Sequence, residues 1–223
     1  QIRTTICYND VSVKIIGSHA GVSVGPDGAT HQALEDMAIM RALPNMIVIS
    51  PTDSIEARKA TMAVARLPQP CYIRLSREKI PVVTTDQTPF EIGKAEVFYG
   101  STDSTGSPQA VSPQVATIIA TGQMVYRALL AAKVLESHKI SVRVINCHTI
   151  KPLDQETILK AAKDTGAIVT AEEHQITGGL GGAVAEVLSQ NYPVPLKIIG
   201  VEDRFGESGD PNELMEKFGL SVD

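Results

Sequence analysis

Short runs of apolar residues alternate along the chain with longer segments in which apolar positions recur at helical spacing. Three runs in the first third of the chain are typical of buried strands, namely residues 11–17 (VSVKIIG), 46–50 (MIVIS) and 71–76 (CYIRLS). Residues 30–43 and 54–67 lie between these runs and show the spacing of amphipathic helices. The alternation indicates a parallel sheet with helices on both faces.

The same alternation starts again after a segment without periodicity, residues 80–93 (IPVVTTDQTPFEIG). Further strands are predicted at 94–100, 115–122, 141–147, 167–173 and 196–202, and helices at 124–138, 153–166, 178–191 and 212–219. Residues 101–114 are rich in Ser, Gly and Pro, which predicts an exposed loop. The predicted fold is α/β, with two three-layer α/β/α domains of mostly parallel strands at 1–83 and 93–223, joined by a linker at 84–92.

Composition narrows the function classes. The 223 residues carry a net charge of −5, so the chain lacks the basic surface typical of nucleic-acid binding. It also lacks an apolar run long enough to span a bilayer, so we expect no membrane partner. There are three widely spaced cysteines, Cys7, Cys71 and Cys147, of which Cys71 and Cys147 lie in apolar, strand-like surroundings and are expected to be reduced core residues. Neither a CxxC nor an HExxH spacing suggests a metal site.

The segment from Gly17 to Arg41 (GSHAGVSVGPDGATHQALEDMAIMR) is the most informative. Three of its four glycines, Gly21, Gly25 and Gly28, are predicted to turn the backbone tightly and to let it approach a ligand closely. Thr30 is placed to cap the helix that follows. A glycine-rich turn before a helix is common, so this pattern is also compatible with a purely structural loop.

Three titratable side chains lie on this loop: His19, Asp27 and His31. Two imidazoles and a carboxylate can hydrogen-bond a polyhydroxylated substrate and move protons near neutral pH. A single histidine in such a place is usually a turn or capping residue. Three groups on one short loop strengthen the case for function, so that the pattern alone fits a functional site and a structural loop about equally well.

Two further motifs are candidates. Arg74 and Arg77 lie at the end of a predicted strand, where ligands of open α/β sheets collect and where a guanidinium can bind phosphate. Glycines at 178–182 (GGLGG) open a helix and could bind an anion, but a Rossmann site needs GxGxxG after the first strand. We therefore assign those glycines to close helix–sheet packing or subunit contact, and the preceding Glu172, Glu173 and His174 to structural or interface roles.

These residues resemble the transketolase family. Residues 17–36 are similar to the substrate loop of that family, at the end of its pyrimidine-binding domain. The resemblance continues in order through 44–60 (PNMIVISPTDSIEARKA), 71–77 (CYIRLSR), 143–154 (RVINCHTIKPLD) and 171–186 (AEEHQITGGLGGAVAE), nearly the whole chain. It implies part of a thiamine diphosphate-binding fold, followed by the transketolase C-terminal domain.

The resemblance implies roles for four residues. His19, Asp27 and Arg77 would bind the sugar phosphate substrate, with Arg77 on its phosphate. His31 would lie beside the amino group of the cofactor and relay protons, as a catalytic and cofactor-binding residue. Arg74 receives no such role and is assigned to the structure.

The implied activity is transfer of a two-carbon ketol unit between sugar phosphates, with thiamine diphosphate as cofactor in a cytoplasmic enzyme. The chain begins at QIRTTICYND, inside the pyrimidine domain. In the family, the cofactor glutamate and stacking aromatics lie upstream, and Mg²⁺ or Ca²⁺ lies on another domain. We therefore expect an isolated chain to be inactive. We expect the enzyme to be a homodimer, or a heterotetramer with an N-terminal diphosphate-binding half.

Three alternatives remain. Deoxyxylulose phosphate synthase and the smaller subunit of oxo-acid dehydrogenases share the outline of the motifs. The pairing of His19 with His31 favours transketolase over both. A noncatalytic assembly module is the third alternative, because the chain by itself offers no diphosphate site.

Overall fold

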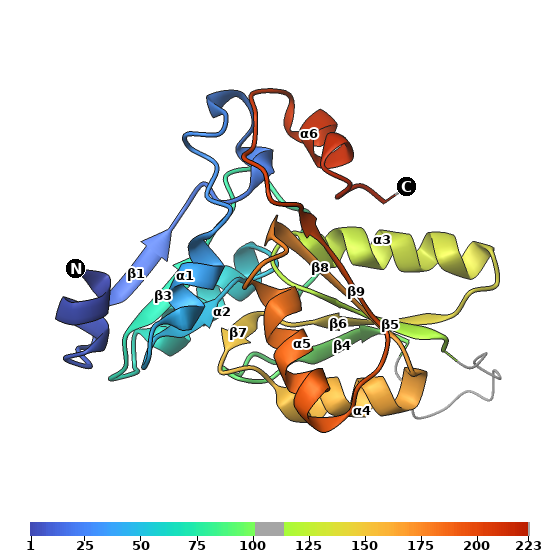
Figure 1. The fold of residues 1–223 in the computed structure, drawn as a ribbon, viewed down its shortest axis with the longest axis horizontal. Coiled ribbons are helices and arrows are strands. Elements are labelled where there is room, and N and C mark those ends of the chain that lie inside the picture. Colours follow the sequence, from blue (N-terminus) through green and yellow to red (C-terminus); the bar gives the residue numbers. More distant parts are fainter. Residues whose placement is uncertain (101–113, 223) are drawn as a thin grey trace.

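Two separate sheets organise the computed structural model, which describes residues 1–100 and 114–222 (Figure 1). The first sheet has the order β1-β3-β2-β7, and its strands are Lys14–Gly17 (β1), Ile47–Ile49 (β2), Cys71–Arg74 (β3) and Thr149–Lys151 (β7). β1, β3 and β2 are parallel, whereas β7 is antiparallel to β2. The first sheet thus combines three strands from the first 83 residues with one strand from the second half of the chain.

The second sheet has the order β4-β6-β5-β8-β9. Its strands are Glu96–Tyr99 (β4), Ala116–Ala120 (β5), Val142–Asn146 (β6), Ile168–Gln175 (β8) and Leu196–Val201 (β9). All neighbours are parallel except β4, which is antiparallel to β6. The mostly parallel α/β fold predicted from the sequence is therefore confirmed.

Helices cover both faces of each sheet, because successive strand residues point to opposite sides. They are Asp36–Ala42 (α1), Ser54–Val64 (α2), Met124–Ser137 (α3), Gln155–Thr165 (α4), Leu180–Asn191 (α5) and Pro211–Lys217 (α6). In β5, Ile118 packs in the cluster that contains α3, while Ile119 packs in the cluster that contains α4 and α5. In β2, Val48 lies with α1 and Ile49 with α2. We call the described residues of 1–83 the first unit and those of 93–223 the second unit; each unit is three-layered.

Two predictions on the first unit are wrong. The strand at 11–17 is not buried: β1 is an edge strand with one neighbour, and Ile16 is 50 % exposed. The helix predicted from residue 30 begins at Asp36, so Thr30 does not cap it. The preceding residues instead close the loop, since buried Gln32 donates from Nε2 to the backbone oxygens of Val22 (3.1 Å) and Glu207 (3.0 Å).

The two units share one core and are not separated by a solvent layer. Met37, Val48 and Tyr72 of the first unit pack in the same buried cluster as Ile145 and Leu180 of the second. The first sheet also takes β7 from beyond the predicted linker, a three-residue strand too short for its pattern to show. The domain boundaries at 83 and 93 remain predictions, and most of the loop predicted at 101–114 lies outside the described residues.

A buried carboxylate joins the two units. Glu56 on α2 is 1 % exposed and accepts hydrogen bonds from the Thr52 backbone N–H (2.6 Å) and from Nδ2 of Asn146 on β6 (2.7 Å). Burial raises the pKa of Glu56 from 4.5 to about 7, although both hydrogen bonds oppose that shift. The Oδ1 atom of Asn146 is buried without a partner.

Replacing Glu56 by glutamine should make the stability less sensitive to alkaline pH. A carboxyl whose pKa is raised by folding stabilises the fold below its unfolded pKa, and that contribution is lost as the pH rises through about 7. Between about pH 5 and pH 8, the wild type should lose about 2 kcal/mol more unfolding free energy than Glu56→Gln. Urea unfolding at both pH values measures this difference. Glu78→Gln, at an exposed site, is the control, and parallel pH profiles for wild type and Glu56→Gln would contradict the prediction.

Candidate functional site

The glycine-rich loop and the segment after β3 leave the first sheet at the same edge. β1 and β3 are parallel neighbours, with Gly17 opposite Arg74, so the residues that follow each strand emerge side by side. Two backbone bonds continue this pairing beyond the strands: Leu75 N–H to Gly17 O (2.7 Å) and Ala20 N–H to Leu75 O (3.2 Å). The roles that the resemblance implies for His19, Asp27 and Arg77 require these two strand ends to be close neighbours, and the pairing of β1 with β3 makes them so.

Arg77 and Asp27 meet at this edge, although they lie 50 residues apart in sequence. Arg77 Nη1 lies 3.1 Å from Asp27 Oδ2 and donates to the Val24 backbone oxygen at 2.8 Å. Both side chains stay open to solvent, with 36 % and 40 % exposure. In the described residues, every hydrogen bond of Arg77 runs from Nη1, which leaves Nη2 and Nε available for an anion.

The two histidines lie on the same loop and are exposed. His19 follows β1 with a positive φ of 62°, and its Nδ1 lies 3.1 Å from Ser18 Oγ. The Nδ1 atom of His31 lies 3.0 Å from Thr30 Oγ1. Within the described chain, neither ring hydrogen-bonds to Asp27 or Arg77. Of the four predicted site residues, a direct contact joins only Asp27 and Arg77.

The three glycines of the loop contact protein, which corrects the expectation that they make room for a ligand. A Cβ on Gly21 would collide with the Glu173 carboxylate, one on Gly25 would press on Pro211, and one on Gly28 would meet the Ser208 hydroxyl. All three partners belong to the second unit. The loop is therefore packed against that unit where the sequence suggested an open approach for substrate.

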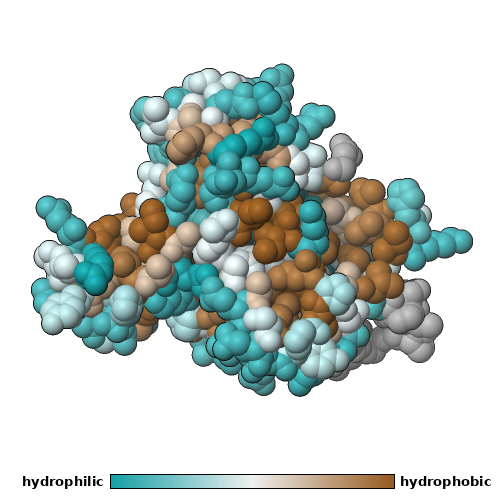
Figure 2. Space-filling model, in the orientation of Figure 1, coloured by the Kyte–Doolittle hydropathy of each residue, from teal (hydrophilic) through white to brown (hydrophobic). Residues whose placement is uncertain are grey.

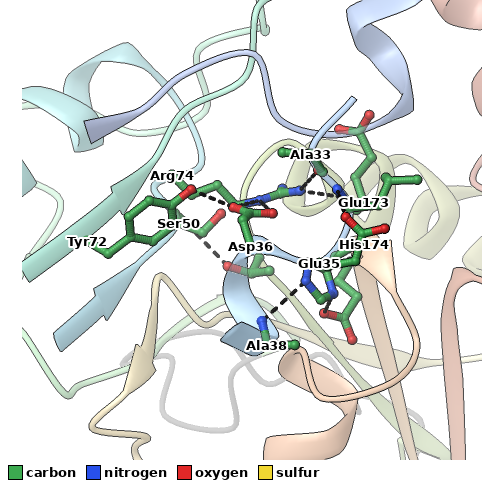
Figure 3. A network of polar contacts seen from close by, with 12 residues as sticks. Ala33, Glu35, Asp36, Ala38, Ser50, Tyr72, Arg74, Glu173 and His174 are labelled. Atoms are coloured by element: carbon green, nitrogen blue, oxygen red, sulfur yellow. Dashed lines mark hydrogen bonds and ion pairs between the residues drawn. The ribbon is translucent and has the colours of Figure 1, made fainter. Parts of the chain in front are cut away.

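Arg74 is a buried structural residue, as assigned from the sequence (Figure 3). Its Nε donates to Asp36 Oδ2 at 2.9 Å, and its Nη2 donates to the backbone oxygens of Ala33 (3.1 Å) and Glu173 (2.8 Å). Burial acts to raise the pKa of Asp36, but Arg74 and the Tyr72 hydroxyl outweigh it and lower that pKa. Arg74 thus connects α1 of the first unit to β8 of the second.

The helix that begins within GGLGG, α5, does bind an anion at its start, and this anion is a carboxylate of the protein itself. Glu172 on β8 accepts hydrogen bonds from the backbone N–H groups of Leu180 and Gly181, both at 2.7 Å. A Cβ on Gly181 would collide with Ile198 on β9, which confirms close helix–sheet packing at this glycine. Burial raises the pKa of Glu172 to about 7, and those two N–H bonds act against the rise. This helix start has no role for an external phosphate.

His174 supports α1 from the second unit (Figure 3). Its Nε2 accepts the Ala38 backbone N–H at 3.3 Å, and its Nδ1 lies 2.7 Å from the Gln175 oxygen, so Nδ1 carries the proton. Burial, followed by the charge of Arg74, lowers the pKa of His174 to about 4. Because α1 has no side-chain cap of its own, a neutral histidine from β8 provides one of its acceptors.

The described residues contain no group of three or more His, Cys, Asp or Glu side chains that could hold a metal ion. None of the helices in residues 1–100 and 114–222 is long and apolar enough to cross a membrane. Cys7, Cys71 and Cys147 are buried and free, which agrees with the core positions expected for Cys71 and Cys147.

Comparison with known proteins identifies both halves of the chain. The family model of the transketolase pyrimidine binding domain matches residues 1–82, and that of the transketolase C-terminal domain matches residues 111–223. A 6-deoxy-6-sulfo-D-fructose transketolase subunit of Clostridium sp. is 41% identical over 100% of this chain and 65% of its own length. A putative transketolase C-terminal section of Methanocaldococcus jannaschii is 42% identical over 98% of this chain and 66% of its own length.

A solved structure described as a split gene transketolase in an inactive β4 tetramer superposes with a TM-score of 0.87 at 44% identity. It covers 99% of this chain, which corresponds to 67% of that protein. The chain thus spans about two thirds of the length of the relatives that it matches.

Proposed function

The chain belongs to the transketolase family, and we propose that it is the substrate-binding, C-terminal part of an enzyme that moves a two-carbon ketol unit from a ketose phosphate to an aldose phosphate. The observation that carries this proposal is the exposed Arg77–Asp27 pair at the ends of β1 and β3. It offers a guanidinium for a phosphate and a carboxylate for a hydroxyl at one place.

The four predicted site residues then have distinct tasks. Arg77 binds the distal phosphate, and Asp27 and His19 hydrogen-bond hydroxyls of the sugar. His31 would lie beside the cofactor when it is bound and would hold or transfer a proton at Nε2, because its Nδ1 is paired with the Thr30 hydroxyl. Imidazole suits this task, since its charge changes near neutral pH.

Thiamine diphosphate, when bound, would supply the electron sink for breaking and forming the carbon–carbon bond. The described residues fit one wall of such a site, because the exposed His31 has an unengaged Nε2 atom. They contain no metal-ligand group, so the diphosphate with its Mg²⁺ or Ca²⁺ would be held by another domain or chain.

We propose a partner that carries this diphosphate-binding half, in a heterotetramer, or a homodimer if both halves lie on one chain. The names of relatives as transketolase subunits and as a C-terminal section support this assembly. The first sheet also ends at β1, where Ile16 is 50 % exposed and Val13 is 39 % exposed. Figure 2 shows apolar surface beside this strand, and such an edge can be covered by further chain.

Reconstitution tests the function. The chain alone should transfer no ketol unit between pentose phosphates. Addition of a separately expressed partner chain that supplies the diphosphate-binding half together with the cofactor glutamate and aromatics, with thiamine diphosphate and Mg²⁺, should produce activity that depends on all components. Sedimentation of the mixture checks that the complex forms.

Three outcomes would count against this proposal. Activity of the chain alone would contradict the need for a partner. An assembled, cofactor-loaded complex without ketol transfer would favour the assembly module. Condensation of pyruvate with a triose phosphate in place of ketol transfer would favour deoxyxylulose phosphate synthase.

A further inference from the structure

Two side chains of the second unit hydrogen-bond Ser23 in the glycine-rich loop and hold it in place. Glu173, at the end of β8, is 3 % exposed, and its Oε1 accepts the backbone N–H of Ser23 at 2.6 Å. Gln123, at the start of α3, donates from Nε2 to Ser23 Oγ at 2.7 Å and also to Glu173 Oε2. Ser23 is therefore held through its backbone and its hydroxyl by two side chains from the other unit.

Further contacts connect Ser23 to the candidate phosphate site at Arg77. Val24, next to Ser23, offers its backbone oxygen to Arg77 Nη1 at 2.8 Å, and the same nitrogen lies 3.1 Å from Asp27. A short chain of contacts thus runs from Glu173 through Ser23 and Val24 to Arg77. Each step is a direct hydrogen bond or a neighbouring residue.

The carboxylate is itself fixed in place. The backbone oxygen of Glu173 accepts from the buried guanidinium of Arg74 at 2.8 Å (Figure 3). On its other side, Gly21 passes so close, with a φ of 90°, that a side chain there would collide with the Glu173 carboxylate. A buried anion held on several sides can set the position of a loop precisely enough to matter for binding.

We propose that Glu173 is a positioning residue for substrate phosphate: through Ser23 and Val24 it sets where Arg77 presents its free guanidinium nitrogens. Glu173 does not touch the substrate. The inference rests on the proposed function, because it assigns to Arg77 the phosphate of the sugar. Through Glu173, the C-terminal domain thus influences the affinity for substrate without a direct contact between Glu173 and the substrate.

The test is steady-state kinetics of the reconstituted enzyme with Glu173→Gln. Glutamine keeps an acceptor for the Ser23 N–H but turns an NH₂ group toward the Gln123 amide, so the charge-assisted bond between the two side chains is lost and Ser23 is held less firmly. We expect the KM for the phosphorylated sugar to rise about tenfold while kcat changes by less than about threefold. Adding Gln123→Glu to Glu173→Gln exchanges donor and acceptor and should return the KM to within about threefold of wild type.

A double-mutant cycle separates positioning from general destabilisation. If Glu173 acts through Arg77, then Glu173→Gln in an Arg77→Ala background should change the KM by less than about twofold. Asp164→Asn, which removes a carboxylate paired with Arg143 at 2.9 Å in the same unit, is the matched control and should leave the KM unchanged. If Glu173→Gln does not fold, Gln123→Ala should still raise the KM by about threefold, since it removes the contact with Ser23 Oγ.

Amide hydrogen exchange of the isolated chain gives a second, activity-free measurement. Residues 21–28 should exchange faster in Glu173→Gln, while α4 is unchanged. An active complex in which Glu173→Gln, or Gln123→Ala in its place, leaves the KM unaltered would overturn the inference. A wild-type complex without ketol transfer would instead overturn the proposed function, and unaltered exchange at 21–28 would then reject the loop contact as well.

Discussion

Replacing Arg77 by alanine should raise the KM of the assembled enzyme for a phosphorylated sugar at least about 30-fold, with little change in kcat. A charged contact of this kind contributes about 2–4 kcal/mol, and a grip on a phosphate remote from the reacting carbons binds ground state and transition state alike. Arg77 is suited to the task because the structure holds it by one nitrogen, Nη1, and leaves the rest of the fork exposed.

Two controls make this measurement specific. An acceptor sugar without a phosphate should show nearly the same KM in Arg77→Ala and in wild type. Arg66→Ala removes another exposed arginine of the first unit and should leave the kinetics unaltered. A KM that is equal for wild type and Arg77→Ala with the phosphorylated substrate would leave Arg77 as the surface partner of Asp27 only.

Replacing Arg74 by methionine should cost about 3–5 kcal/mol of unfolding free energy. The exposed fractions of the side chains of Arg74 and Asp36 are 7% and 11%, so the substitution leaves a carboxylate buried beside Tyr72 without its cation. It also removes the donors to the backbone oxygens of Ala33 and Glu173. Urea unfolding of the chain measures this loss.

The matched control is Arg58→Met. Arg58 pairs with Asp86 at the surface, where 62% and 73% of the two side chains are exposed, and such pairs contribute at most about 1 kcal/mol. Similar losses in the two variants would show that the Arg74–Asp36 pair has no special weight. A loss confined to Arg74→Met would identify the buried Arg74 side chain, which also donates to the Glu173 backbone oxygen, as a principal connection between the units.

The order of strands and helices followed from the sequence because it depends on local periodicity. Each parallel strand is an apolar run, and each helix repeats its apolar positions, so neither needs knowledge of distant residues. The short β7 was missed because three residues carry no period. The exposure of β1 was missed because a strand does not record whether one or two neighbours flank it.

The candidate site could be predicted in part. Its residue types and its place after two strands were visible in the motifs, and parallel pairing of β1 with β3 then brought Arg77 to Asp27. Glu173 and His174 were assigned to structural or interface roles, but the groups that they contact could not be derived, because a carboxylate and a histidine look alike in sequence whether they face solvent, substrate or another unit. The one signal available in the sequence was their place at the end of the apolar strand predicted at 167–173.

The sequence by itself thus determined the family, the α/β alternation and the chemistry available on the loop. Only the tertiary structure decided what the loop glycines contact, where α1 begins, and which anion occupies the start of α5. Gly21 packs against the Glu173 carboxylate, α1 begins at Asp36, and Glu172 accepts hydrogen bonds from the N–H groups of Leu180 and Gly181. The physical reason is the same in each case: the partner lies more than 100 residues away or across a turn, so that packing, and not local propensity, selects it.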